Sequence, residues 1–511
     1  MLFNSHVFLA FLLVTLVGFQ FLSKRHVEAG KTWLVAASLF FYGWWKFSYL
    51  ALLLGSVCGN FLLAGFISRA REDGRSTTSL LSFGVAANLG LIGYFKYAGF
   101  FVETANALAA TGLPVPQIVL PLAISFFTFQ QIAYLVDTAR GETEKGKFLD
   151  YLLFVTFFPQ LIAGPIVHHK EMLPQFAKPQ SANFSRNLSI GVTIFILGLF
   201  KKVGIADEIA PYADVVFDAA ANGYAPTLFE AWTGALAYTL QIYFDFSGYS
   251  DMAIGLGWMF GIRLPLNFFS PYKARNIIEF WRRWHITLSR FLRDYLYISL
   301  GGNRYGVPRR FVNLFLTMLL GGLWHGAGWT FVMWGGLHGF YLIVNHGWRA
   351  LRPQRSTSWL SVSLSWLVTF IAVVVAWVFF RAVDFPSAML VFNGMWGGNG
   401  VAFSHEFAGA LPFDPTVFGA QLVSQLPLLA SSRPLLLIVP GIVICLALPN
   451  TIEFMRRYRP VLDPTHVVPS VRHRQWWAWR PALHWSVITA VIGIYAALNL
   501  ARVSPFLYFQ F

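Results

Sequence analysis

Apolar segments recur along nearly the whole of this chain, and this pattern limits the fold more than any other feature. About 20 apolar residues in a helix are enough to cross the hydrocarbon core of a membrane. The sequence therefore predicts an all-α polytopic membrane protein that forms a single domain over residues 1–511, with roughly eleven to thirteen membrane segments. The shorter segments are expected to be tilted, broken or re-entrant helices that pack within protein. The candidate segments are Phe8–Leu22, Trp33–Trp45, Tyr49–Ile67, Leu80–Tyr94, Ile118–Val136, Leu152–Val167, Leu188–Phe200, Leu228–Phe244, Phe311–Leu323, Phe331–Val344, Trp359–Phe380, Leu435–Leu448 and Trp485–Leu500.

Composition supports this class and excludes others. Of the 511 residues, 56% are hydrophobic and only 12% are charged, which is too apolar for a soluble globular protein of this length. The formal charge of +15 indicates contact with anionic membrane lipid rather than nucleic acid. Cys58 and Cys445 lie in apolar segments, so we expect buried small side chains rather than a disulfide or metal site. The sequence has no complete phosphate-binding loop of the Walker type, which argues against an ATP-driven pump.

Basic residues around the first apolar segment predict the orientation of the chain. Met1–His6 contains no Lys or Arg, whereas Lys24, Arg25 and Lys31 follow the segment. This order is the reverse of a secretory signal peptide. By the positive-inside rule it places the N-terminus outside and the basic cluster in the cytoplasm.

A histidine stands at the end of one apolar segment. His325 follows Phe311–Trp324 and lies within the glycine-rich stretch Gly321–Thr330. A titratable ring at membrane depth usually faces a cavity, a partner or a reaction, and imidazole is well suited to proton transfer near neutral pH. Glycines also allow helices to pack closely. The pattern alone therefore leaves two interpretations: a catalytic histidine, or a histidine hydrogen-bonded at a small-residue helix contact.

A second histidine, His338, follows thirteen residues later. On a continuous helix it would point away from His325, so we interpret it as structural. A metal site shared by the two histidines lacks a third ligand at a suggestive spacing. The sequence therefore predicts no metal site.

The segment Arg275–Tyr297 is expected to form one amphipathic helix. At about 100° per residue, aromatic and aliphatic residues share one face, and charged residues occupy the other. Such a helix suits the cytoplasmic membrane interface, with arginines toward headgroups or an anionic ligand. His285 falls at the edge between the two faces. The apolar face contains Phe280, Trp281, Trp284, Leu288, Phe291, Leu292 and Tyr295, and the polar face contains Glu279, Arg282, Arg283, Ser289, Arg290, Arg293 and Asp294.

Two carboxylates, Asp245 and Asp251, lie in the apolar and aromatic stretch Gln241–Met252. Buried acids need partners, and Lys or Arg from the amphipathic helix is the expected source. The alternative is that one acid orients His325.

Two further stretches predict broken helices. Pro121–Gln130 and Phe158–Ile166 place prolines and polar residues inside apolar segments. Such breaks are expected beside a cavity, although they are also common in purely structural membrane helices.

These strings together resemble the membrane-bound O-acyltransferase (MBOAT) family, and in particular its bacterial branch containing the inner-membrane subunit of alginate O-acetyltransferase. The resemblance runs from Asn4 to about Arg381, whereas residues 402–481 match less clearly. Its most specific feature is the order of Tyr-Phe-Asp-Phe-Ser-Gly-Tyr-Ser-Asp, Phe-Trp-Arg-Arg-Trp-His-Ile-Thr-Leu-Ser and Leu-Trp-His-Gly. The strongest matches are Pro121–Gln130, Phe158–Pro165, Gln241–Gly257, Glu279–Arg304 and Leu320–Gly339.

The resemblance implies a fold and a site. A ring of helices is expected around a thin central region, with a funnel from each side. The family's invariant histidine falls on His325, and its second recurrent polar position falls on His285. Four further residues become candidates for a substrate channel, namely Asp245, Trp324, Arg282 and Arg283. The two arginines suit phosphates of an acyl donor as well as lipid headgroups.

The resemblance also implies an activity, which is O-acetyl transfer to an exported polysaccharide. Bacterial members of this kind take an acetyl group from a cytoplasmic donor and pass it outward to periplasmic partner proteins. The expected donor is an acetyl thioester, acetyl-CoA, acting as substrate, and no bound cofactor is expected. Neutral His325 would accept the proton of the attacking hydroxyl. Backbone N–H groups near Gly321–Gly328 are possible donors to the oxyanion.

Two other functions remain open from the sequence. A glycan or acyl-intermediate transporter would use His325 as a proton relay and would suit broken helices. It lacks a visible inverted repeat and leaves the Trp-His-Gly element unexplained. A scaffold for a polysaccharide synthesis and export complex would need His325 only as a structural residue. Alginate, cellulose and other exopolysaccharides are all compatible acceptors.

Overall fold

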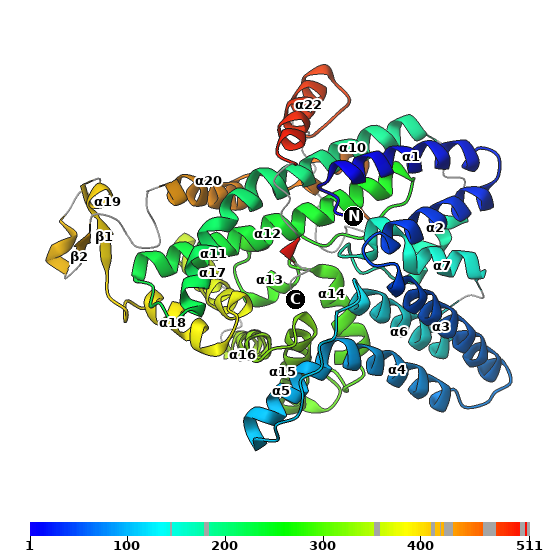
Figure 1. The fold of residues 1–511 in the computed structure, drawn as a ribbon, viewed down its shortest axis with the longest axis horizontal. Helices are drawn as coiled ribbons and strands as arrows, with labels where there is room; N and C mark the ends of the chain where they lie inside the picture. Colours follow the sequence, from blue (N-terminus) through cyan, green and yellow to red (C-terminus); the bar gives the residue numbers. More distant parts are fainter. Residues whose placement is uncertain are drawn as a thin grey trace. The chain divides into compact units, whose positions relative to one another are not determined.

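The computed structural model describes residues 1–143, 146–177, 183–351, 358–409, 414–418, 421–423, 433–462, 477–500 and 506–507 (Figure 1). The regular secondary structure of these residues is almost entirely helical, which confirms the all-α class. The exception is a short parallel pair, β1 (Ala402–Ser404) with β2 (Gln421–Val423), in which Ala402 faces Gln421. Much of the weakly matched region 402–481 lies outside the described residues.

The chain forms two compact units, which are described separately. Unit 1 comprises residues 1–199, 249–267 and 451–510, and unit 2 comprises residues 200–248 and 268–450. The long helix α12 (Leu228–Met259) contributes residues to both. The expectation of a single domain stays a prediction.

Unit 1 is a helical assembly with an aromatic core. Phe8, Phe41 and Phe158 lie in mutual ring contact, and Asn60 and Asn88 exchange hydrogen bonds of 3.2 and 2.7 Å between two helices. Such amide pairs hold apolar helices together where water is absent. Its elements are α1 (His6–Ser23), α2 (Val27–Gly43), α3 (Ser48–Glu72), α4 (Thr78–Ile92), η1 (Gly93–Tyr97), α5 (Ala98–Ala109), α6 (Ile124–Arg140), α7 (Phe148–Thr156), α8 (Phe158–Leu161), α9 (His169–Phe176), most of α10 (Phe184–Phe200), α21 (Thr451–Phe454), η6 (Arg456–Tyr458) and α22 (Leu483–Leu498).

The two stretches that predicted broken helices lie at helix boundaries of unit 1. Ala123 has a left-handed backbone with φ of 60°, and α6 begins only after it. Helix α7 ends at Thr156, and a single short helix with Pro159 near its start follows. The break before α6 follows Pro121, and the one before α8 precedes Pro159 at the first helical turn, a position where proline is tolerated. The prediction of a broken helix is confirmed at Phe158–Ile166, whereas at Pro121–Gln130 the proline lies before the start of α6. The cavity expected beside such breaks stays a prediction.

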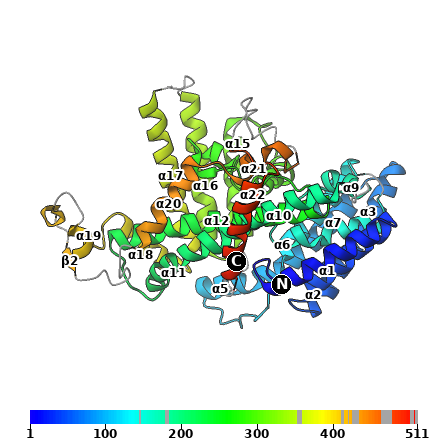
Figure 2. The same ribbon diagram turned by 90° about the horizontal axis from the view of Figure 1, so that it is seen from above.

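Unit 2 contains the histidine-rich motifs. Its helices α15 and α16 pack very closely, because a Cβ on Gly322 would lie 2.3 Å from the carbonyl oxygen of Phe331 and 3.0 Å from the Cα of Gly335. Helices α16 and α17 lie side by side (Figure 2). Its elements are η2 (Lys201–Ala206), α11 (Asp207–Ala221), the first part of α12, η3 (Pro271–Lys273), α13 (Ile277–Trp281), α14 (Ile286–Phe291), η4 (Leu292–Tyr297), α15 (Gly306–His325), α16 (Trp329–Leu351), α17 (Trp359–Arg381), α18 (Phe385–Met395), β1, α19 (His405–Gly409), η5 (Pro415–Phe418), β2 and α20 (Arg433–Ala447).

Five helical runs in the described part of the chain are long and apolar enough to cross a membrane. Their outward residues are large and hydrophobic; Leu13 and Val17 of α1, for example, are 65% and 63% exposed. Exposed apolar faces of this kind are suited to lipid. The five runs are His6–Ser23, Ser48–Glu72, Thr78–Ala109, Phe184–Ala221 and Trp359–Arg381, and the shorter apolar helices are Arg433–Ala447 and Leu483–Leu498. The total of eleven to thirteen crossings stays a prediction.

Candidate active site

The segment Arg275–Tyr297 is not one helix, so that prediction is wrong. It consists of α13, α14 and the π-helical turn η4, with a break at 282–285. The carbonyl of Arg283 accepts a hydrogen bond of 2.9 Å from the backbone N–H of Phe269. This carbonyl therefore bonds to a distant loop and not to the next turn of a helix. A tertiary contact of this kind leaves no trace in helical periodicity.

The apolar face of this segment packs within unit 2 rather than against lipid. Trp284 lies 4.9 Å from the ring of Trp377, and Phe280 stacks 6.0 Å from the ring of His338. The expected split between faces is nevertheless present, since these aromatic rings are buried while Arg282 and Arg293 are exposed.

His285 lies at the break itself and is completely buried. Its φ and ψ of 39° and 55° are left-handed, a conformation that costs a non-glycine residue roughly 1–2 kcal/mol. Its ring contacts Phe246 at 4.8 Å and lies 6.4 Å from the ring of His325. The prediction of a residue at the edge of an interfacial helix is therefore wrong, because the break turns this side chain inward. Strained buried residues of this kind cluster at functional sites.

His325 is the last residue of α15 and is 4% exposed. Its ring is surrounded by Trp324 at 4.9 Å, Trp334 at 5.0 Å and Phe380 at 5.2 Å. The close approach of α15 and α16 shows that nearby glycines serve helix packing. The small-residue contact is thus present, and a catalytic role for the histidine is compatible with it.

His338 belongs to α16, whereas His325 ends α15, so the two do not share a continuous helix. The prediction that His338 points away from His325 assumed one continuous helix, and that assumption is wrong. Its ring lies 4.8 Å from that of Trp334, which also contacts His325. Its Nδ1 accepts a hydrogen bond of 3.3 Å from the indole N–H of Trp281.

Asp245 is buried and pairs with Lys202, whose Nζ lies 2.5 Å from its Oδ1. The same ammonium lies 2.8 Å from Asp207. The prediction that a Lys or Arg of the segment Arg275–Tyr297 pairs with this acid is therefore wrong, because Lys202 lies on η2. Asp251 instead belongs to unit 1, where it accepts a hydrogen bond of 2.6 Å from Thr451.

The structure brings part of the predicted site together. Trp324 contacts both His285, at 6.4 Å, and His325. Asp245 precedes Phe246, the residue in contact with His285. Arg283 is engaged by Glu279 at 2.8 Å and by the carbonyl of Phe269, whereas Arg282 is exposed.

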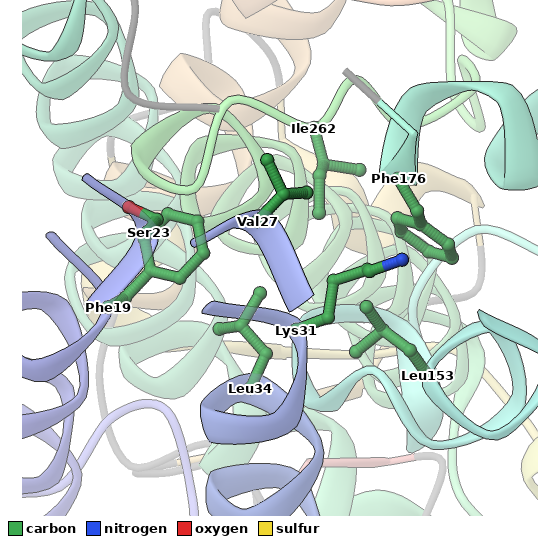
Figure 3. Close-up of a pocket in the computed structure, with 8 residues that line it drawn as sticks. All are labelled: Phe19, Ser23, Val27, Lys31, Leu34, Leu153, Phe176 and Ile262. Carbon is green, nitrogen blue, oxygen red and sulfur yellow. The ribbon is translucent and has the colours of Figure 1, made fainter. Parts of the chain in front are cut away.

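A pocket in unit 1 is lined mainly by apolar side chains and by Lys31 (Figure 3). Lys31 belongs to a Gly-Lys-Thr triplet, but it lies within α2 rather than in a phosphate-binding loop. Its ammonium is 2.6 Å from Asp150 and 3.1 Å from Glu28, so its charge is compensated by protein. The lining contains none of the predicted site residues. Its members are Phe19, Ser23, Val27, Lys31, Leu34, Leu153, Phe176 and Ile262.

Sequence reasoning missed Lys202 and gave Trp334 no role. A signal for the lysine was present, because a charge inside the apolar run Phe184–Ala221 requires a partner. For Trp334 no comparable signal exists, since tryptophans are common throughout the chain.

Comparisons with known proteins identify the family to which this chain belongs. Residues 117–383 match the model of the membrane-bound O-acyltransferase family. The chain is 47% identical to a peptidoglycan O-acetyltransferase of Helicobacter pylori, over 79% of this chain and 81% of the relative. It is 44% identical to the probable alginate O-acetylase AlgI of Pseudomonas putida, over 78% and 80%. A teichoic acid D-alanyltransferase of Streptococcus thermophilus is 28% identical, over 46% and 58%. The chain is therefore a membrane protein and an acyltransferase that belongs to the MBOAT family.

Proposed function

We propose that this protein is an O-acetyltransferase that moves an acetyl group from cytoplasmic acetyl-CoA across the inner membrane for O-acetylation of an exported polysaccharide. The observation that carries the proposal is the pair of buried histidines, His325 and His285, whose rings lie 6.4 Å apart in unit 2. Relatives that are named as O-acetylating enzymes support the acetyl group.

The proposed chemistry is base-assisted transfer. Neutral His325 takes the proton of an acceptor hydroxyl as its oxygen bonds to the thioester carbonyl carbon. The tetrahedral intermediate then collapses, the carbon–sulfur bond breaks, and protonated His325 returns the proton to the leaving thiolate. The products are an O-acetyl ester and a free thiol. Arg282, which is exposed, is a candidate for attracting the donor's phosphates.

The acceptor is proposed as a polysaccharide of the cell envelope or an exopolysaccharide such as alginate or cellulose. Relatives are named for peptidoglycan, alginate and teichoic acid, so the family scaffold serves several polymers. We also propose periplasmic acetyltransferase partners and a polysaccharide synthesis and export complex, because specificity for the polymer is then supplied outside this chain.

The proposed orientation has a periplasmic N-terminus, on the evidence of the basic cluster after the first apolar segment. His6 is exposed at the start of α1. A His6→Cys variant in intact cells should therefore react with an impermeant thiol reagent after the outer membrane is opened. Labelling only in inverted inner-membrane vesicles would contradict the orientation.

The function is tested with purified protein in liposomes, using acetyl-CoA labelled in the acetyl group and hydroxyl acceptors from the polymer fraction. Transfer predicts label in an alkali-labile ester on the acceptor. The transporter alternative predicts movement of a glycan across the bilayer with no new ester, and that result would overturn the proposal.

His285→Ala should impair transfer less than loss of His325. A positioning contact worth about 1–3 kcal/mol corresponds to roughly a 5- to 150-fold effect on rate. If the contact is on the donor side, the defect persists at saturating acceptor. The measurement is kcat with matched amounts of folded protein, and His346→Ala, a half-buried histidine of α16, is the control. Wild-type kinetics in His285→Ala would make this histidine purely structural.

A further inference from the structure

Two buried N–H groups on α16 find no acceptor among the described residues. Trp334 and His338 are 1% and 0% exposed, and within the described residues neither Trp334 Nε1 nor His338 Nε2 has a hydrogen-bond partner. The two residues are four apart on α16 and so share one face of the helix. Native proteins rarely bury a donor without an acceptor, because the group loses its hydrogen bond to water. A pair of such donors on one helix face indicates that a ligand supplies the acceptor.

The hydrogen bond from Trp281 determines which nitrogen of His338 carries the proton. An indole N–H only donates, so His338 Nδ1 must be the accepting nitrogen in this 3.3 Å contact. In a neutral imidazole the other nitrogen then carries the hydrogen. His338 therefore offers an Nε2–H donor, and Nε2 is the atom that no described residue satisfies.

Trp334 contacts the ring of His325 directly, and His338 contacts Trp334. The ring centroid of Trp334 lies 5.0 Å from that of His325 and 4.8 Å from that of His338. Phe380 contacts both His325 and Trp334, and Trp377 stacks 5.7 Å from Trp334. The surroundings are thus aromatic, and in such a medium of low polarity a hydrogen bond to a developing negative charge is strong.

We propose that Trp334 Nε1–H and His338 Nε2–H bind the carbonyl oxygen of the acyl group and stabilise the oxyanion of the tetrahedral intermediate. The inference rests on the proposed acyl transfer and names two groups that act in it. When the hydroxyl oxygen bonds to the carbonyl carbon, the π electrons of the carbonyl move to its oxygen, which accepts both hydrogen bonds. Neither donor gives up its proton. When the carbonyl re-forms, the thiolate leaves and takes its proton from His325.

The amide variants of His338 distinguish a donor role from a structural one. Glutamine places an amide N–H near the position of Nε2, whereas asparagine places a carbonyl oxygen near Nδ1, where it can still accept from Trp281. If His338 donates to the oxyanion, His338→Gln retains much of kcat and His338→Asn loses about 10²–10³-fold. If His338 serves only as the acceptor for Trp281, the order is reversed, and that outcome overturns the proposal.

Trp334→Phe gives a second, independent test, because it removes the N–H and keeps an aromatic ring. We expect kcat to fall by about 10²–10³-fold with little change in KM for acetyl-CoA. The matched control is Trp232→Phe, whose N–H donates to the carbonyl of Met395 at 3.0 Å in the same unit. Thermal unfolding confirms that each variant is folded. Wild-type kcat in folded Trp334→Phe would also overturn the proposal.

Failure of this inference is distinguishable from failure of the proposed function. If His325 is not the base for acyl transfer, the His325→Ala variant transfers acetyl groups as the wild-type protein does. If only the oxyanion donors are wrong, His325→Ala is inactive while the two His338 amides rank in the structural order or are equal.

Discussion

His325→Ala and His325→Gln are expected to lower acetyl transfer by about 10²–10⁴-fold, the usual contribution of a positioned general base. Neither side chain can take a proton from the acceptor hydroxyl and return it to the thiolate. The ring is 4% exposed and packed by Trp324, Trp334 and Phe380, so water has little access to replace it. The measurement is kcat of purified protein in liposomes, with the unfolding midpoint recorded in parallel.

The control for His325 separates loss of chemistry from loss of packing. Glutamine is closer in volume to histidine than alanine is, so a packing effect should be smaller for His325→Gln. Loss of the base should affect both variants to a similar extent. His346→Ala should retain wild-type transfer. If folded His325→Ala kept more than about a tenth of wild-type kcat, a general-base role would be untenable.

Lys202→Met is expected to lower the free energy of unfolding by about 3–5 kcal/mol, more than the other substitutions proposed for this protein. The ammonium of Lys202 lies between two carboxylates, Asp245 at 2.5 Å and Asp207 at 2.8 Å, and its side chain is 4% exposed. Its removal takes this cation away from both carboxylates within an apolar helix bundle. Native proteins have only about 5–15 kcal/mol of net stability, so much less folded protein should be recovered.

The experiment on Lys202 compares denaturant unfolding of the purified variants in detergent. Lys170→Met is the control, since it breaks an exposed pair with Glu142 and should cost less than about 1 kcal/mol. Adding Asp245→Asn to Lys202→Met should recover part of the loss, because it neutralises one of the two carboxylates that lost their contact with Lys202. Equal stability of Lys202→Met and Lys170→Met would show that the buried pair contributes no more than a surface pair.

Several features of the fold were predictable because their causes are local. A long apolar run forms a helix wherever it lies, and α3 and α17 coincide with predicted segments. The starts of α6 and α8 lie within a few positions of Pro121 and Pro159, the prolines that marked these stretches in the sequence. The end of α15 at His325 also has a local cause, because the next residue, Gly326, has an extended rather than helical backbone.

The partners of buried charges were not predictable, because sequence separation hides them. Asp245 pairs with Lys202, which precedes it by 43 residues in the sequence. The carboxylate alone indicates that some cation is required, since an isolated buried charge is too costly. Which cation meets it depends on how η2 and α12 pack.

The amino-acid sequence by itself determined the membrane class, the helical segments and the two histidine motifs, because hydrophobicity and short-range backbone preferences act within a few residues. Only the tertiary structure decided that His285 turns inward, since that depends on the Arg283 carbonyl bonding to Phe269. It also decided that Trp334 contacts both His325 and His338, because α15 and α16 pack closely at Gly322 and Gly335. Contacts between distant segments form only on packing, and the chemistry proposed for this site depends on them.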